Sequence, residues 1–199
     1  HYLITSARSS GMFVYGIYDL SLYGDEGEIG EITLKNTASA NLTGAAYKDF
    51  IKHYNLDGVL LSGCENPEIA GSYSDYMLYG AGRSYEQYLQ DNALMMLRSA
   101  RALTQKYNPN TQVGLLTEPV WATLANDEAG VDITAESAGW LATNLDSKKL
   151  LEEDLVDFIA VKNFTFTADT NQPFETIAKW WDTLAEANEE PVYMLHAAD

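Results

Sequence analysis

The chain has 199 residues and 46% of them are hydrophobic, so it is long and apolar enough to bury a sizeable core. Its net charge of −17 argues against a nucleic-acid partner and against anionic membrane surfaces, whereas a neutral ligand such as a sugar is not repelled. A single cysteine excludes an internal disulfide, and no run approaches the roughly 20 apolar residues of a transmembrane segment.

The N-terminal region predicts one strand and a series of loops. Residues 1–5 lack a basic stretch followed by a long apolar core, so we expect no signal peptide here. Residues 12–20, MFVYGIYDL, predict a buried strand. Residues 24–30 predict an acidic, glycine-rich loop or hairpin turn, residues 32–34 could form a short strand, and residues 36–41 predict a loop.

The next segment predicts a helix, a buried strand and a long loop. Thr43 can cap a helix over residues 44–54, whose buried stripe comprises Ala46, Tyr47, Phe50, Ile51 and Tyr54. The apolar run at residues 58–61 predicts a buried parallel strand. Residues 62–83 contain four glycines and three tyrosines and predict a loop, of a length that is usually functional or disordered.

The longest helix is predicted to run from Ser84 to Tyr107. Ser84 followed by Gln87 forms a capping-box pattern, and Pro109 lies just beyond the predicted end of the helix. The apolar face that we expect to be buried comprises Leu89, Ala93, Met96, Leu97, Ala100 and Leu103. A buried strand at residues 112–116 follows.

Helices and strands continue to alternate up to the last residues. Residues 121–135 predict a loop, 136–143 a helix, 147–153 a short helix and 157–161 a buried strand. Pro173 then suits the first turn of a helix, where its missing N–H is harmless. The inner face of that helix comprises Phe174, Ile177, Trp181 and Leu184, and residues 191–195 predict the last strand.

The alternation of elements from Thr43 onward predicts an α/β fold of parallel strands covered by helices. We expect a TIM-barrel-like (β/α) domain with five or six strands, and an open sheet is the alternative. A closed eight-stranded barrel takes about 250 residues, so the barrel would be incomplete or truncated. Its exposed strand edges would then be covered by missing chain segments or in a homo-oligomer. No internal repeat or linker is visible, which predicts a single domain over residues 1–199, with residues 1–42 the least defined part.

Three carboxylates follow predicted strands and are candidate catalytic groups: Asp19, Glu65 and Glu118. Ligands in parallel α/β folds bind beyond the carboxyl ends of the strands, and two carboxylates there could share acid, base or nucleophile roles at a glycosidic bond. Glu118 directly follows its strand and is therefore the best placed. The alternative for each residue is a structural carboxylate at the rim of the sheet.

Other strand ends carry polar groups that could bind a substrate. Lys162 and Asn163 follow one strand and could contact a sugar hydroxyl, although Lys162 could equally pair with one of the many acids. His196 follows the last strand and could act as a general base or a sugar contact. Lone histidines in such positions are more often structural.

Other kinds of site lack a supporting pattern. Cys64 follows a strand end, but a nucleophilic cysteine needs a base that no sequence pattern supplies. No HxH, HExxH or CxxC spacing is present, and Gly80-Ala81-Gly82 precedes a helix without following a strand. We therefore expect neither a metal ion nor a cofactor.

Several segments resemble the bacterial glycosyl-hydrolase-like family ten: YNLDGVLL at 54–61, DNALMMLRSARALTQKYNPNTQVGLLTEPVW at 91–121, LLEEDLVDFIAVKNF at 150–164 and FETIAKWWDTLAEANEEPVYMLHAA at 174–198. The resemblance spans roughly residues 47–198 and implies a TIM barrel. It also implies an extracellular or cell-surface bacterial protein that acts on glycans such as peptidoglycan. On this comparison Asn92 and Trp121 match positions that the family keeps.

The chain departs from the family at the chemical positions. Where the family has a His-Phe-Asp-Asp run, residues 60–63 read Leu-Leu-Ser-Gly, and its Ser-Pro-Phe-Gly becomes Thr-Glu-Pro-Val at residues 117–120. Two hypotheses follow. In the first, Glu118 and Glu65 form the carboxylate pair of a divergent glycoside hydrolase, with Asn163 and Trp121 lining the sugar site. In the second, the domain is a catalytically inactive carbohydrate-binding or surface scaffold.

Overall fold

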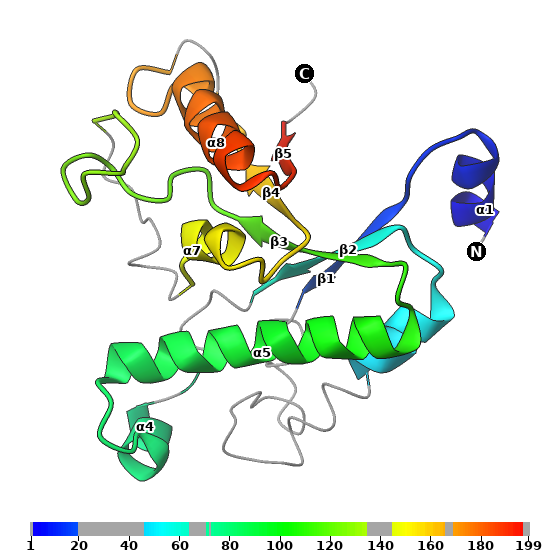
Figure 1. The fold of residues 1–199 in the computed structure, drawn as a ribbon, viewed down its shortest axis with the longest axis horizontal. Coiled ribbons are helices and arrows are strands. Elements are labelled where there is room, and N and C mark those ends of the chain that lie inside the picture. Colours follow the sequence, from blue (N-terminus) through cyan, green and yellow to red (C-terminus); the bar gives the residue numbers. More distant parts are fainter. Residues whose placement is uncertain are drawn as a thin grey trace. The chain divides into compact units, whose positions relative to one another are not determined.

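The computed structural model describes residues 2–19, 46–63, 71, 73–134, 145–165 and 169–196. These residues form a mixed α/β fold with five strands, each parallel to its described neighbours (Figure 1). They group into two compact units, His1–Val113 and Gly114–Asp199. Five strands agree with the number expected from the sequence, and closure of the strands into a barrel stays a prediction.

The first unit contains two parallel strands and the longest helix. Its elements are α1 (Tyr2–Ser9), β1 (Tyr15–Asp19), β2 (Gly58–Ser62), α4 (Tyr73–Tyr79) and α5 (Tyr85–Tyr107), together with a helical segment at residues 46–53. The pairing register runs from Tyr15 opposite Gly58 to Asp19 opposite Ser62. Helix α1 was not predicted, whereas the predicted helix at residues 44–54 and the buried strand at 58–61 are confirmed over the described residues.

Strand β1 lies within the predicted range 12–20, but the prediction that it is buried is wrong for one of its faces. Tyr18 is 5% exposed and contacts the rings of Tyr47 and Phe50 at 4.9 and 5.1 Å, whereas Ile17 is 56% exposed. Successive side chains of a strand point to opposite faces. Only one face of β1 packs on the helical segment 46–53, so alternate side chains stay exposed.

The predicted loop at residues 62–83 contains the helix α4. Its rings pack against the start of α5: Tyr76 lies 5.4 Å from Tyr85 and 5.9 Å from Tyr88. The Tyr76 hydroxyl donates to the carbonyl of Arg83 at 2.8 Å. Aromatic contacts between elements thus stabilise a seven-residue helix that local sequence propensity did not reveal.

Helix α5 begins and ends as predicted. The Ser84 hydroxyl accepts a hydrogen bond from the backbone N–H of Gln87 at 3.1 Å, and Asn108 caps the other end. The predicted face is buried except at Leu103, and Thr104 is buried beside it. The Thr104 hydroxyl lies 2.8 Å from that of Tyr47, which joins α5 to the helical segment 46–53. Burial raises the pKa of Tyr47 to about 12.

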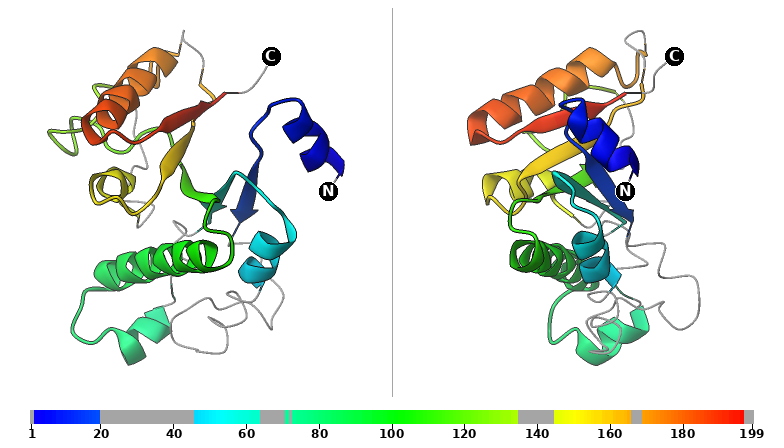
Figure 2. Two further views of the ribbon diagram at one scale, coloured as in Figure 1. Left: turned by 45° about the vertical axis from the view of Figure 1, so that its right-hand side comes forward. Right: turned by 90° about the vertical axis from the view of Figure 1, so that its right-hand side faces the viewer.

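The second unit contains three parallel strands and two helices. β3 (Gln112–Thr117), which begins at the end of the first unit, is followed by α7 (Ser147–Glu152), β4 (Phe158–Lys162), α8 (Phe174–Asn188) and β5 (Val192–Leu195). Each strand pairs with the next in chain order, and α8 contacts α7 and β5 (Figure 2). The short helix, the helix after Pro173 and the three strands were all predicted to within about two residues.

Burial differs between these strands. The side chains of β3 and β4 are almost all buried, as predicted, but those of β5 are half-exposed, and Tyr193 is 44% exposed. Among the described residues β5 pairs with β4 along one edge only, which leaves it less covered than its neighbours.

The predicted features at Thr43, residues 24–41 and residues 136–143 lie outside the described residues. No helix in the described part of the chain is long and apolar enough to span a membrane.

Asp57 joins the start of β1 to the residues before β2. Its carboxylate accepts hydrogen bonds from the backbone N–H of Val14 at 2.7 Å and from the guanidinium of Arg8 at 2.9 Å. The Val14 N–H, with Arg8 beside it, holds the pKa of the Asp57 carboxyl below its usual value. The carboxylate form therefore stabilises the first unit.

Replacing Asp57 with asparagine is expected to lower the free energy of unfolding by about 1–2 kcal/mol at pH 7, because the two hydrogen bonds that the carboxylate accepts lose their charged acceptor. The Asp57 side chain is 26% exposed, so solvent screening keeps the loss small. Because the pKa is depressed in the folded state, the difference between wild type and Asp57→Asn shrinks as the pH falls below about 4. Denaturant unfolding of both proteins between pH 7 and pH 2 measures this difference in the free energy of unfolding.

Asp91→Asn is the matched control. Asp91 pairs with Arg83 at 2.8 Å, but its side chain is 48% exposed, so the loss of its charge is expected to cost less than the loss at Asp57. Equal losses for the two variants, or a difference that persists at pH 2, would contradict the role of Asp57.

Candidate functional site

The pairing register of the second unit aligns the residues that follow its strands. Thr117 lies opposite Val161, which places Glu118 beside Lys162. On the next strand pair, Lys162 lies opposite Leu195, and the residues that follow them, Asn163 and His196, are in contact. We call these four polar residues, Glu118, Lys162, Asn163 and His196, the β3–β5 edge.

Glu118 and Lys162 form an ion pair at this edge. The Lys162 ammonium donates to the Glu118 carboxylate at 2.9 Å, and the two side chains are 26% and 45% exposed. The alternative that Lys162 pairs with an acid is therefore confirmed, and the acid is the leading catalytic candidate. Both charged groups remain accessible to a ligand, which would meet a hydrogen-bond donor and an acceptor side by side.

Asn163 is fully buried and fixes the turn after β4. Its amide N–H donates to the carbonyl of Phe174 at 3.4 Å, and its amide oxygen accepts from the Thr165 hydroxyl at 2.7 Å. The His196 ring nitrogen Nδ1 lies 3.4 Å from the Asn163 carbonyl oxygen, and the ring is exposed. The contacts of Asn163 thus fix the backbone after β4, whereas the exposed His196 ring is accessible to a ligand.

Trp121 lies in the core of the second unit. It is 5% exposed, Trp180 stacks on its ring at 5.8 Å, and the Lys148 ammonium lies over the ring at 5.4 Å. Its indole N–H donates to the carboxylate of Asp146 at 2.8 Å, and Asp146 also caps α7. These contacts occupy the indole, so the structure places Trp121 as a packing residue, and its predicted sugar contact stays a prediction.

The remaining predicted residues belong to the first unit. Asp19 ends β1 opposite Ser62, and Asn92 is 1% exposed on the buried face of α5. Glu65 and Cys64 lie outside the described residues. The predicted pairing of Glu118 with Glu65 or Asp19 across one cleft therefore stays a prediction. Within the described ranges, no group of three or more His, Cys, Asp or Glu side chains could hold a metal ion.

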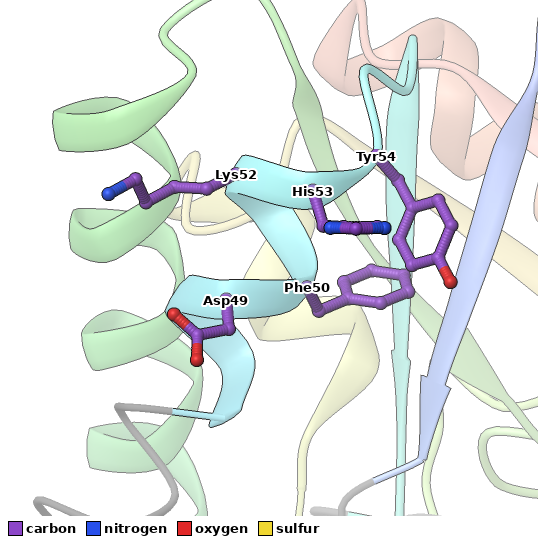
Figure 3. Close-up of a pocket in the computed structure, with 5 residues that line it drawn as sticks. All are labelled: Asp49, Phe50, Lys52, His53 and Tyr54. Carbon is purple, nitrogen blue, oxygen red and sulfur yellow. The ribbon is translucent and has the colours of Figure 1, made fainter. Parts of the chain in front are cut away.

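A surface pocket of about 450 Å³ is present in the first unit, and a single chain segment supplies its lining residues Asp49, Phe50, Lys52, His53 and Tyr54. Figure 3 shows Phe50, His53 and Tyr54 gathered on one side of the segment, and Asp49 and Lys52 pointing away from them. Its charged groups do not converge, and it contains none of the predicted site residues. We place the candidate site at the β3–β5 edge, where polar groups do converge.

Sequence reasoning missed the residue that positions the chain after Glu118. Trp181 on α8 is fully buried, and its indole N–H donates to the carbonyl of Pro119 at 2.7 Å. Its neighbour Trp180 donates to the carbonyl of Ala129 at 2.9 Å. Trp181 was predicted only as part of the inner face of its helix, because periodicity reveals burial but not the partner of an indole N–H.

Comparisons with known proteins support a glycosyl hydrolase-like relationship. No protein-family profile matches the chain. Proteins named glycosyl hydrolase DigH from Escherichia coli strain K12, Escherichia coli O157:H7 and Shigella flexneri are each 22% identical to it over 151 residues. The match covers 73% of this chain and 34% of each relative, so the chain spans about a third of the length of these proteins.

Trp181→Phe is expected to lower the free energy of unfolding by about 2 kcal/mol, because it removes buried contacts and the donor to the Pro119 carbonyl. Trp180→Phe makes the same chemical change at a partly exposed position and is expected to cost less. Denaturant unfolding, monitored by circular dichroism, compares the free energies of unfolding of the two variants. An equal or larger loss for Trp180→Phe would show that the Pro119 contact does not dominate.

Proposed function

We propose that this chain is a glycoside hydrolase-like domain that binds a glycan at the β3–β5 edge. The observation that carries the proposal is the partly exposed Glu118–Lys162 ion pair at the carboxyl ends of adjacent parallel strands. Ligand sites of parallel α/β folds lie at this end of the strands. The distant similarity to proteins named glycosyl hydrolase supports the same class of ligand.

The ion pair suits the hydroxyl groups of a sugar. The Glu118 carboxylate can accept a hydrogen bond from one hydroxyl, and the Lys162 ammonium can donate to its neighbour. His196 adds a third polar group directly after the next strand, β5. Adjacent ring hydroxyls present both donors and acceptors, so a single pyranose could bind both partners of the pair.

The charge of the chain disfavours strongly anionic glycans. With a net charge of −17, the chain repels polyanionic chains over distances up to the Debye length. A neutral polysaccharide meets no such repulsion. The resemblance to glycosyl-hydrolase-like family ten suggests a bacterial cell-wall glycan, such as a peptidoglycan strand, and an extracellular or cell-surface location, and we include both in the proposal.

Hydrolysis would require a second carboxylate. Glycosidases place two carboxyl groups about 5–10 Å apart, one on each side of the scissile bond. At the β3–β5 edge the other strands end in Lys162, Asn163 and His196, so Glu118 would act with Glu65 or Asp19, as the sequence suggests. In that arrangement the two carboxylates would divide the acid, base and nucleophile roles between them. If neither residue reaches it, the domain binds a glycan without cleaving it.

Glu118→Gln is expected to weaken glycan binding roughly tenfold or more, because it removes a charged acceptor and the partner of Lys162. Calorimetric titration with soluble peptidoglycan fragments and neutral oligosaccharides measures binding, and release of reducing ends measures cleavage. Glu186→Gln is the matched control, since it makes the same change at an exposed position on α8. We expect Glu186→Gln to bind as wild type does.

The outcomes separate the two hypotheses. Cleavage that is lost in Glu118→Gln and in Glu65→Gln or Asp19→Asn identifies a hydrolase and its carboxylate pair. Binding without cleavage identifies a carbohydrate-binding domain. The proposal fails if the wild-type chain binds none of the glycans, or if Glu118→Gln binds them as tightly as wild type.

A further inference from the structure

We propose that Phe164 is the platform on which a sugar ring stacks at the β3–β5 edge, and that Phe164 selects pyranose rings with one face free of axial hydroxyls. The inference rests on the proposed function and extends it from polar contacts to the apolar face of the sugar. Phe164 was not among the predicted site residues. The structure draws attention to it through its exposure and its surroundings.

Phe164 directly follows the polar residues of the edge and is 53% exposed. An isolated exposed phenylalanine carries no functional meaning by itself. Here the preceding side chain, Asn163, is fully buried and anchors the segment that bears the ring. An aromatic ring is thus held at the surface within two residues of Lys162, one partner of the ion pair.

The backbone on both sides of Phe164 is fixed. The backbone N–H of Asn163 donates to the carbonyl of Val161 at 2.9 Å, and the Asn163 amide oxygen accepts from the Thr165 hydroxyl at 2.7 Å. The Asn163 amide N–H reaches the carbonyl of Phe174 at the start of α8. A ring on a fixed turn loses little conformational entropy when a ligand stacks on it.

Further aromatic groups lie around the same asparagine. The rings of Phe174 and His196 meet edge to face at 5.1 Å, and the His196 ring also contacts the Asn163 carbonyl. Aromatic side chains thus come to this edge from the segment after β4, the start of α8 and the segment after β5. The edge combines an apolar aromatic part with the charged Glu118–Lys162 pair.

A pyranose matches this combination of groups. Its ring presents C–H groups on its faces and hydroxyls around its rim, so one face can stack on an aromatic ring while the rim hydroxyls reach charged groups. Phenylalanine has no hydroxyl and supplies contact area without hydrogen bonds. An axial hydroxyl on the stacking face would hold the two rings apart, which gives the platform its selectivity.

Calorimetric titration of the intact chain with fully N-acetylated chitohexaose, a neutral oligosaccharide whose ring hydroxyl and acetamido groups are equatorial, tests the inference. We expect Phe164→Ala to bind roughly ten- to a hundredfold more weakly, as the loss of about half of a phenylalanine's contact area predicts. Phe164→Trp should bind within about threefold of wild type, and Phe164→Leu should lie between Phe164→Ala and wild type, because it keeps apolar area but not the flat ring. A mannose hexamer with axial 2-hydroxyls should bind more weakly than chitohexaose to wild type and to Phe164→Trp, whereas Phe164→Ala should lose this discrimination.

Phe13→Ala is the matched control, because Phe13 is 77% exposed on the first unit and should leave binding unchanged. If Glu118→Gln weakens chitohexaose binding while Phe164→Ala does not, the platform is wrong and the proposed function stands. If wild type does not bind chitohexaose or any other glycan, both are overturned. A thermal destabilisation by Phe164→Ala as large as that by Trp181→Phe would show that the ring packs in the core, which also overturns the inference.

Discussion

The parallel register of β3, β4 and β5 is the constraint on which the candidate site depends. Parallel strands end at the same edge of a sheet, and their hydrogen bonds fix which residues face each other. Thr117 opposite Val161 brings Glu118 to Lys162, and Lys162 opposite Leu195 brings the following residues into contact. A shift of one residue would turn every side chain of a strand to its other face and separate the charged pair.

Tryptophans hold the chain that continues from this edge. Trp181 donates to the carbonyl of Pro119, and Trp180 stacks on Trp121, so α8 is fixed to the segment that follows β3. Aromatic rings bury a large area, and their N–H groups satisfy carbonyls that would otherwise lose a partner on burial. The buried Trp121 ring is thus part of the packing that joins α8 to this segment.

Much of the fold could be predicted because it depends on local signals. The cap at Ser84 and the stripe of α5, together with the apolar runs of β2, β3 and β4, identify elements without knowledge of their partners. Features that depend on contacts between distant residues could not be predicted. Examples are α4, which tyrosine contacts stabilise, the exposed face of β1, and the core position of Trp121. The strand-end rule located Glu118 and Lys162 but did not identify them as partners.

The same limit explains why the sequence did not identify Glu118 as the acid that pairs with Lys162. The sequence offers carboxylates at several strand ends, which suggests a catalytic pair, yet the register joins Glu118 to a lysine. A carboxylate that already accepts a hydrogen bond from an ammonium is held in one orientation, so its other lone pairs are preorganised to accept a hydrogen bond from a sugar hydroxyl. To cleave a glycosidic bond, a second carboxylate must approach from outside the three strands of this edge. The glycan binding that we propose therefore needs only the groups that β3, β4 and β5 position, whereas hydrolysis would need a second carboxylate from outside these strands.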